Sequence, residues 1–252
     1  MDGNLRLPTE TLCSTLAQVH VVESALIPIF IGFDPREEIA FDVLAYSIRA
    51  KSSRPVSIEP IALDRLKGVL TRPRDPKQST DFSFSRFLTP YLSGFEGWSL
   101  YADCDMLFFD DVAKLWALRD ERFAVMAVKH DYESKVVTKH FSSRQTRYEK
   151  KNWSSLMLFN NALCLALMPD YVNTASGLEL HQFKWLENKE LVGDLPLRWN
   201  YLVGEYPFDP DVSNIHFTNG GPYLDECRTC DYAADWFTAE KAAAGHRRCG
   251  SP

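Results

Sequence analysis

Short apolar runs alternate with longer amphipathic segments between residues 27 and 128. The apolar runs have the length of buried strands, and the amphipathic segments carry apolar residues at mainly helical spacing. We expect strands at Ile27–Phe33, Val56–Leu63, Trp98–Ala102 and Phe123–Val128, and helices at Arg36–Lys51, Phe82–Leu92 and Val112–Leu118. This order predicts an α/β fold in which helices flank a mainly parallel central sheet.

Residues 129–151 interrupt this alternation, because they contain seven Lys or Arg, three acidic residues and no long apolar run. Such a segment is typical of a solvated excursion, and it is also a candidate acceptor-binding or lid segment. Strand-like apolar runs follow at Ser155–Phe159 and Ala162–Met168, and the pattern then predicts a helix over Gly177–Asn188.

The pattern divides the chain into three parts, of which only the middle one has the size of a domain. Residues 1–26 lack clear periodicity, and we expect an N-terminal extension there. Residues 27–223 are predicted to form a single α/β domain. Residues 224–252 are rich in turn formers and aromatic residues, which favours a C-terminal tail packed on the domain.

Composition narrows the class of protein. Hydrophobic residues make up 45% and charged residues 25% of the chain, as in ordinary globular proteins. The formal net charge of −6 argues against a broad face for nucleic acid. The longest apolar run, residues 25–33, is far shorter than the ~20 residues of a membrane span. No secretory signal is visible, so we expect a cytoplasmic protein whose six cysteines are reduced.

The strongest candidate for chemistry is the pair of carboxylates in Asp103-Cys104-Asp105. The pair follows one expected strand and precedes the apolar run Met106–Phe109, and ligands of open α/β sheets bind at the carboxyl ends of strands. Two carboxylates at this spacing can hold a divalent cation that also binds a diphosphate. The chain contains a second such pair, Asp209-Pro210-Asp211, but its prolines indicate an ordinary turn.

The segment Tyr101–Phe109 resembles the strand, Asp-x-Asp and apolar signature of nucleotide-sugar-dependent glycosyltransferases with the GT-A fold. Further segments, in the right order, resemble the retaining enzymes of family 8, which include glycogenin and bacterial lipopolysaccharide galactosyl- and glucosyltransferases. These segments are Ile29–Asp34, Phe84–Pro90, Leu158–Asn161, Leu195–Asn200 and His216–Pro222. The resemblance covers roughly residues 27–223 and implies a GT-A-like domain that transfers a hexose from a nucleotide sugar, such as a UDP-hexose, to a glycan acceptor.

The resemblance also implies roles for individual residues. His216 would be the third ligand, beside Asp103 and Asp105, of Mn²⁺ or Mg²⁺, and its imidazole favours Mn²⁺. A buried structural histidine is the alternative for His216, and ordinary turn residues are the alternative for Asn160 and Asn161. The implied donor-binding residues are Phe33 and Asp34 at the base, Arg86 and Asp103 at the phosphates, Asn160 and Asn161 at the sugar, and Gly220 and Gly221 in the last motif.

Two departures from the family pattern set this chain apart. Gly221 stands where the last motif usually has a lysine that contacts the β-phosphate, so the phosphate charge must be met by Arg86, the metal or the backbone N–H groups of Gly220 and Gly221. The family's Asp-Gln-Asp appears only as His181-Gln182-Phe183. The resemblance implies retention of anomeric configuration, with Gln182 and Asp194 as candidate catalytic groups near the anomeric carbon.

A separate signal lies near the C-terminus. Cys227-x-x-Cys230 and His246-x-x-Cys249 have a spacing that could close a structural zinc site, although scattered thiols and a frayed terminus are the simpler explanation. Two other functions therefore stay open beside the transferase. One is a nucleotide-sugar hydrolase that uses the same site, and the other is a non-catalytic binding module with a zinc-stapled tail.

Overall fold

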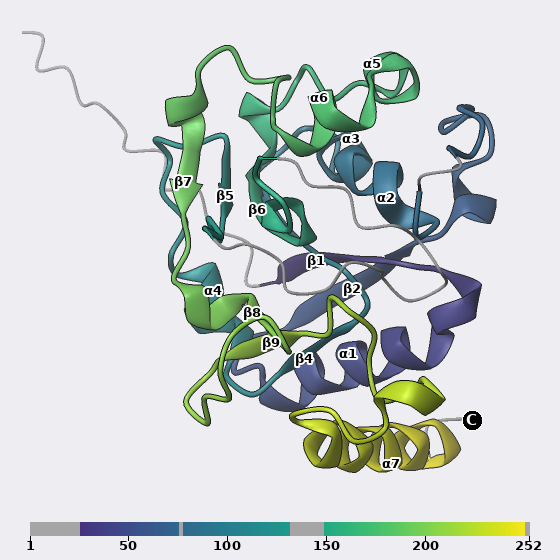
Figure 1. The fold of residues 1–252 in the computed structure, drawn as a ribbon. Coiled ribbons are helices and arrows are strands. Elements are labelled where there is room, and N and C mark those ends of the chain that lie inside the picture. Colours follow the sequence, from purple (N-terminus) through teal and green to yellow (C-terminus); the bar gives the residue numbers. More distant parts are fainter. Residues whose placement is uncertain (1–25, 76–77, 132–148, 250–252) are drawn as a thin grey trace, which may run out of the picture.

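A computed structural model of the chain describes residues 26–75, 78–131 and 149–249, with side chains as far as residue 246. The predicted extension over residues 1–26 and most of the 129–151 segment lie outside these residues. A central sheet with helices on both faces forms the body of the protein, and a smaller sheet lies beside it (Figure 1). The expected α/β class is therefore confirmed.

The central sheet has six strands in the order β2-β1-β3-β6-β5-β7. Their bounds are β1 Ile27–Gly32, β2 Val56–Ile61, β3 Trp98–Ala102, β5 Val125–Ala127, β6 Leu156–Asn160 and β7 Val192–Asp194. The pairs β1–β2, β1–β3 and β5–β7 are parallel, whereas β6 runs antiparallel to both β3 and β5. One reversed strand thus makes the sheet mixed, and the carboxyl ends of the other five meet at one edge.

The smaller sheet has the order β4-β9-β8, with β4 at Met106–Phe108, β8 at Tyr201–Leu202 and β9 at Asn214–His216. Strand β9 pairs antiparallel with β4 and parallel with β8. Its register places Met106 opposite His216. This pairing brings two segments that are more than a hundred residues apart to the end of β3.

Helices cover the sheet on both sides. The α-helices are α1 Glu38–Lys51, α2 Phe82–Ser85, α3 Thr89–Leu92, α4 Val112–Trp116, α5 Pro169–Thr174, α6 Gly177–His181 and α7 Ala233–Cys249. Alternate residues of the strands point to opposite faces. Ile29 and Leu100 pack against α1 and α4 on one face, whereas Tyr101 and Phe159 pack towards α5 and α6 on the other.

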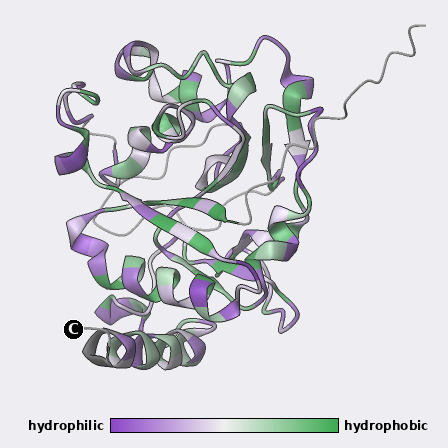
Figure 2. Ribbon diagram, turned by 180° about the vertical axis from the view of Figure 1, so that it is seen from behind, coloured by the Kyte–Doolittle hydropathy of each residue, from purple (hydrophilic) through white to green (hydrophobic). Residues whose placement is uncertain are grey.

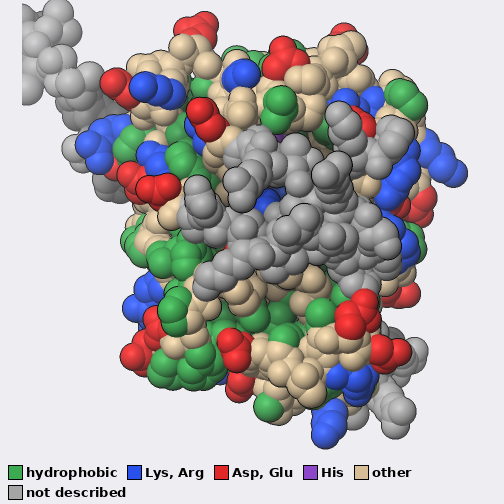
Figure 3. Space-filling model, in the orientation of Figure 1, with side chains coloured by type: hydrophobic (Ala, Val, Ile, Leu, Met, Phe, Trp, Pro, Cys, Tyr) green, Lys and Arg blue, Asp and Glu red, His purple; other side chains and the backbone are tan. Residues whose placement is uncertain are grey.

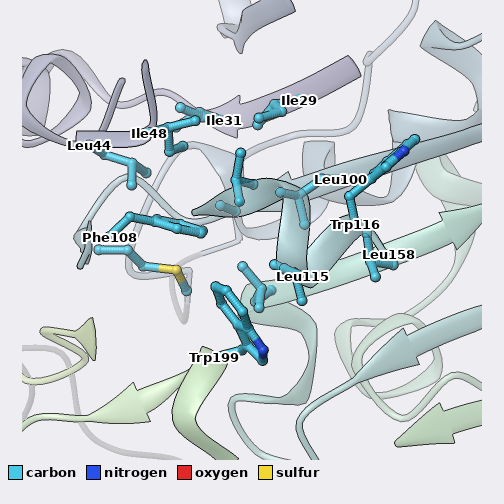
Figure 4. Close-up of a cluster of buried hydrophobic side chains, with 14 of the residues drawn as sticks. Ile29, Ile31, Leu44, Ile48, Leu100, Phe108, Leu115, Trp116, Leu158 and Trp199 are labelled. Carbon is cyan, nitrogen blue, oxygen red and sulfur yellow. The ribbon is translucent and has the colours of Figure 1, made fainter. Parts of the chain in front are cut away.

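Figure 4 shows the first of these cores, where side chains from α1, β1, β3, α4 and β6 point towards one another around Phe108 and Trp199. Hydrophobic residues gather along the central strands, and polar residues are more frequent in the peripheral turns (Figure 2). Burial of this apolar surface is the main force that holds the layers together, at about 25 cal/mol per Å². The sheet edge that carries the candidate residues is therefore anchored in a packed core.

The predicted helix over Phe82–Leu92 is broken, because α2 and α3 are joined by a 3-10 turn at Arg86–Leu88. Pro90 has no N–H to donate to the carbonyl of Arg86. That carbonyl instead accepts from the backbone and the hydroxyl of Thr89, the latter at 2.8 Å. The break directs the Arg86 side chain into the interior, where it is only 6% exposed.

Two other predicted elements differ from the structure. The helix expected over Gly177–Asn188 ends at His181, because Phe183 takes a left-handed backbone with φ of 56° and the Lys184 N–H turns back to the carbonyl of Glu179. The apolar run Ala162–Met168 forms turns and no strand, and it exposes several of its apolar side chains.

The C-terminal residues contain a regular helix where the sequence pattern indicates only a tail. Helix α7 packs against α1 through a third apolar core, in which Trp236 is 1% exposed and lies with Val43 and Ile215 (Figure 1). Among the described residues, no helix is both long and apolar enough to span a bilayer.

Candidate functional site

The two carboxylates of the Asp103-Cys104-Asp105 motif lie in the turn between β3 and β4. The backbone of this turn is held at both ends. The N–H of Asp103 donates to the carbonyl of Ser155 at 2.8 Å, and the carbonyl of Asp105 accepts from the N–H of Phe217 at 2.8 Å. The start of β6 and the end of β9 therefore fix the motif from two sides.

His216 completes a three-residue group. It is the last residue of β9, and its Nε2 lies 3.3 Å from Oδ1 of Asp105. The potential ligand atoms of Asp103, Asp105 and His216 all lie within 4.8 Å of one another. Within the described part of the chain, no other group of three or more His, Cys, Asp or Glu residues is so arranged. The turn at Asp209–Asp211 does not take part.

A buried amide sets the orientation of the His216 ring. Nδ2 of Asn200 donates to the carbonyl of Asn152 at 3.3 Å and to Oγ of Ser155 at 2.9 Å, which turns its Oδ1 towards Nδ1 of His216 at 3.1 Å. An amide oxygen only accepts, so Nδ1 of His216 donates this hydrogen bond and Nε2 is the ring nitrogen that faces Asp105. This is the arrangement of a metal-ligating histidine with an outer hydrogen-bond partner.

Asp103 is a buried carboxylate, 7% exposed, with two strong partners. Arg86 forms an ion pair with it at 3.0 Å, and the Tyr101 hydroxyl donates to Oδ1 at 2.7 Å. Burial raises the pKa of Asp103, the Arg86 charge opposes this rise, and the negative charge of Asp105 adds to it. Because two carboxylates share this low-dielectric position, a divalent cation between them and His216 suits the donor set well.

Arg86 lies buried beside Asp103. Its guanidinium donates to the carbonyls of Ser154 at 2.9 Å and Phe82 at 3.3 Å, in addition to its contact with Asp103. The side chain therefore holds Asp103 and the turn before β6 in place. A contact with donor phosphates stays a prediction.

The structure does not bring Asn160 and Asn161 to this site. Strand β6 runs antiparallel to β3, so Asn160 pairs with Trp98 at the start of β3, while Leu156 pairs with Ala102 beside the motif. The resemblance of Leu158–Asn161 to the sugar-lining segment of the family could not show this, because a local sequence pattern does not give the direction of a strand. We correct the interpretation accordingly: both asparagines lie at the opposite edge of the sheet.

The residues that do lie beside the motif precede β6. Asn152 adopts a left-handed backbone with φ of 64°, which asparagine tolerates better than most residues. Its carbonyl accepts from Asn200 and from the Ser155 hydroxyl, the latter at 2.7 Å. The Ser154 hydroxyl bonds Nδ1 of His181 at 2.7 Å. A polar turn directly before an apolar strand was the available signal for residues 152–155.

Phe33 and Asp34 follow β1 at the same edge of the sheet as Asp103. Asp34 is 1% exposed and caps the 3-10 turn Pro35–Glu37, with hydrogen bonds from the N–H groups of Arg36 at 3.0 Å and Asp81 at 3.1 Å. Burial raises the pKa of Asp34, but these bonds and the Arg36 side chain outweigh it and leave the pKa lowered. Asp34 is thus an ionised carboxylate that shapes the turn after β1.

The candidate catalytic residues are separate from the three-residue group. Gln182 caps the end of α6, and its carbonyl accepts from Nζ of Lys150 at 2.7 Å. Asp194 ends β7 at the edge of the sheet, where its side chain is 73% exposed and pairs with Lys129 at 2.9 Å. Their placement near a reacting carbon stays a prediction.

The last motif returns from β9 over the site. Gly220 has φ of 112°, a conformation that glycine adopts without strain, and its N–H donates to the carbonyl of Phe217 at 2.8 Å. A Cβ on Gly221 would lie 2.5 Å from the ring of Tyr223, so glycine is required there by a close approach. A lysine at this position, which is usual in the family that the chain resembles, would not fit beside Tyr223 as it lies here.

The predicted zinc site is not assembled among the described side chains. Cys227 and Cys230 are free, half-buried thiols. His246 lies on α7 and packs edge-on against Tyr46 of α1, with ring centroids 5.5 Å apart. The side chain of Cys249 lies outside the described residues.

Solved structures with the same architecture identify the fold. The structure matches the apo form of WbbM, a bifunctional glycosyltransferase, over 87% of the chain with a TM-score of 0.59 and 15% identity. It matches the galactosyltransferase LgtC, solved with donor and acceptor sugar analogs, over 86% of this chain and 96% of LgtC, with a TM-score of 0.53 and 12% identity. The chain spans 50% of WbbM and 60% of GlyE from Streptococcus pneumoniae TIGR4. The protein has the GT-A glycosyltransferase fold.

Sequence similarity identifies the family. No protein-family model matches the chain. Protein CDI of Arabidopsis thaliana is 44% identical over 217 residues, which are 82% of this chain and 83% of that protein. The chain belongs to the family of Protein CDI.

Proposed function

We propose that the protein is a metal-dependent glycosyltransferase that moves a hexose from a nucleotide-sugar donor, such as a UDP-hexose, to a glycan acceptor with retention of configuration. One observation carries the proposal. In a GT-A fold, Asp103, Asp105 and His216 converge at the carboxyl end of β3, with all their potential ligand atoms within 4.8 Å. Ligands of open α/β sheets bind at this edge.

The three residues would hold Mn²⁺ or Mg²⁺, and the mixed oxygen and nitrogen donor set favours Mn²⁺. A cation bound there supplies Lewis-acid stabilisation of the diphosphate as it leaves. Asn200 keeps Nε2 of His216 directed into the site, and Arg86 keeps Asp103 in place. Preorganised charge of this kind needs no rearrangement during the reaction.

The nucleotide is proposed to lie along the end of β1, beside Phe33 and Asp34, which share the sheet edge with Asp103. Gln182 and Asp194 are the proposed groups near the anomeric carbon. His181, next to Gln182, is tied through Ser154 to the Arg86 and Asp103 pair, which supports placing this turn on the sugar side of the site.

Surface charge is compatible with a small-molecule donor and a carbohydrate acceptor. On the face seen in Figure 3, the described basic and acidic side chains are interspersed with apolar ones.

The test is a calorimetric titration of UDP into the purified protein, first with Mn²⁺ and then with EDTA. We expect binding only with the metal, and loss of that binding in Asp105→Ala at unchanged thermal stability in EDTA. Binding that is indifferent to both changes would overturn the metal assignment. A titration of Glu38→Gln, which removes one exposed carboxylate of α1, is the matched control.

Turnover then separates a transferase from a hydrolase on the same site. A panel of UDP-hexoses is incubated with Mn²⁺, with and without oligosaccharide acceptors, and the products are identified by mass spectrometry. A glycosylated acceptor supports the proposal. Release of free hexose at the same rate with every acceptor would replace the transferase by a nucleotide-sugar hydrolase.

A further inference from the structure

A buried carboxylate lies directly behind the Asp103-Cys104-Asp105 motif, and neither the sequence pattern nor the proposed function uses it. Glu37 is 6% exposed and ends the 3-10 turn that follows Asp34. Its neighbour Glu38 is exposed at the start of α1. Burying a carboxyl group is costly unless hydrogen bonds compensate for the lost water. The hydrogen-bond partners of Glu37 therefore show which contacts compensate for its burial.

Both oxygens of Glu37 accept hydrogen bonds from segments that belong to the site. The Tyr223 hydroxyl donates to Oε1 at 2.9 Å, and the Cys104 thiol donates to Oε2 with a sulfur–oxygen distance of 3.6 Å. Cys104 stands between the two acidic ligands and is fully buried. One carboxyl group thus joins three chain segments: the turn after β1, the metal-binding motif and the segment after His216.

The packing around Tyr223 shows that this contact is built into the C-terminal segment. The tyrosine ring approaches Gly221 so closely that a Cβ there would lie 2.5 Å from the ring. The ring also lies 5.9 Å, centroid to centroid, from the indole of Trp236 in α7. The hydroxyl is therefore delivered to Glu37 by a ring that packs against both Gly221 and Trp236.

We propose that Glu37 is a positioning residue for the metal centre. Its carboxyl group joins the Cys104 thiol, in the motif that carries Asp103 and Asp105, to the Tyr223 hydroxyl, in the segment after His216. The inference rests on the proposed function, because it concerns the same metal centre. Without this tie, the turn keeps its backbone bonds to Ser155 and Phe217 but loses the side-chain bond at Cys104, between its two acidic residues. Changes in such outer hydrogen-bond partners typically weaken metal binding by about 10–100-fold.

The test measures Mn²⁺ affinity directly, from the electron paramagnetic resonance signal of free Mn²⁺, without donor or acceptor. The proteins are the wild type, Glu37→Ala, Glu37→Gln, Tyr223→Phe, the double variant Glu37→Ala/Tyr223→Phe and the control Glu38→Ala. We expect Glu37→Ala and Tyr223→Phe each to weaken binding by about 10–100-fold. Glu37→Gln should recover most of the affinity, because its amide oxygen still accepts from Tyr223. The double variant should be no weaker than the worse single variant.

Each outcome decides between defined alternatives. Wild-type affinity in a folded Glu37→Ala protein would show that the carboxyl group is merely structural. Equal losses in Glu37→Gln and Glu37→Ala would contradict a role for the Tyr223 hydrogen bond, because the glutamine oxygen can still accept it. If Glu37→Ala does not fold, Tyr223→Phe, which removes one hydroxyl, decides the question. If the wild type itself does not bind Mn²⁺, the proposed function fails and the positioning role fails with it.

Discussion

Buried polar residues lie at both ends of strand β6, but the two ends differ in the groups that they contact. At the end near the Asp103-Cys104-Asp105 motif, the carbonyls of Ser154 and Ser155 accept from the Arg86 guanidinium and the Asp103 N–H. At the other end, the Asn161 amide accepts from the Ser99 hydroxyl and donates to the carbonyl of Glu96, both at 2.8 Å. One end holds a buried ion pair. The other end has neutral hydrogen bonds at Asn161 and a bond from Asn160 to the exposed carboxylate of Glu121 at 3.1 Å.

The difference supports the proposal that the metal site lies at the Asp103 end of β6. The Arg86 and Asp103 side chains form an ion pair although each is no more than 10% exposed. Well-packed apolar residues of similar volume often stabilise a protein as well as, or better than, such a pair. The buried ion pair is therefore not needed to stabilise this edge of the sheet, which favours a role for its charges in binding. At the Asn161 end, the two hydrogen bonds of the Asn161 amide pair polar groups of a turn, and neither involves a charged side chain.

The largest expected effect follows from breaking the ion pair. Arg86→Met leaves Asp103 buried without its cationic partner, and we expect a loss of about 3–5 kcal/mol in the free energy of unfolding. The measurement is urea unfolding in EDTA. The double variant Arg86→Met/Asp103→Leu should recover most of the loss, because no lone charge remains. A loss below about 1 kcal/mol in the single variant would mean that the pair is effectively solvated.

A second effect concerns pH. Burial, with the nearby charge of Asp105, raises the pKa of Glu37 from 4.5 to about 7. The unfolded chain therefore loses this proton at lower pH than the folded protein, so stability falls as pH rises from about 4.5 through 7. We expect the wild type to lose about 2 kcal/mol more than Glu37→Gln between pH 5 and pH 8 in EDTA. Parallel stability curves for the two proteins would contradict this.

The orientation of His216 gives a smaller effect, confined to metal binding. Asn200→Ala removes the oxygen that accepts from Nδ1, so the ring can present its protonated nitrogen to the site. We expect Mn²⁺ affinity to fall by about 10–100-fold. Electron paramagnetic resonance of free Mn²⁺ measures it, and unchanged affinity would show that Asp105 alone orients the ring.

Asn161 tests the other end of β6. Asn161→Ala leaves the Glu96 carbonyl and the Ser99 hydroxyl without their partner, and we expect a loss of about 1–2 kcal/mol in stability. Mn²⁺ affinity should be that of the wild type. A variant that keeps its stability but loses metal affinity would reverse the assignment of the two ends.

The smallest effect is expected in the C-terminal segment. Cys230 is a half-buried free thiol whose pKa burial raises to about 11, so it is a protonated thiol at neutral pH. Cys230→Ser should change stability by no more than about 0.5 kcal/mol and leave UDP binding intact. Elemental analysis of both proteins checks for zinc. Stoichiometric zinc in the wild type, lost in the variant, would restore the zinc hypothesis.

Sequence pattern alone was sufficient where local spacing carries the information. Apolar runs and helical spacing placed β1, α1, β2, β3 and α4 within a few residues of their observed bounds, because burial on one face depends on neighbours two to four positions away. The same local signal placed Asp103 and Asp105 at the end of a strand. The short strands β8 and β9 and the helix α7 carried too few periodic residues to be recognised.

Tertiary structure alone decided the direction of β6, and with it the placement of Asn152–Ser155 beside Asp103 and of Asn160 at the far edge. It also decided the pairing of β4 with β9 that brings His216 to Asp105, and the contact of Glu37 with Cys104 and Tyr223. Strand direction and pairing depend on hydrogen bonds and packing between residues far apart in the chain, on which local periodicity carries no information. The sequence by itself determined the kinds of element and the position of the acidic pair, and long-range packing determined which side chains meet there.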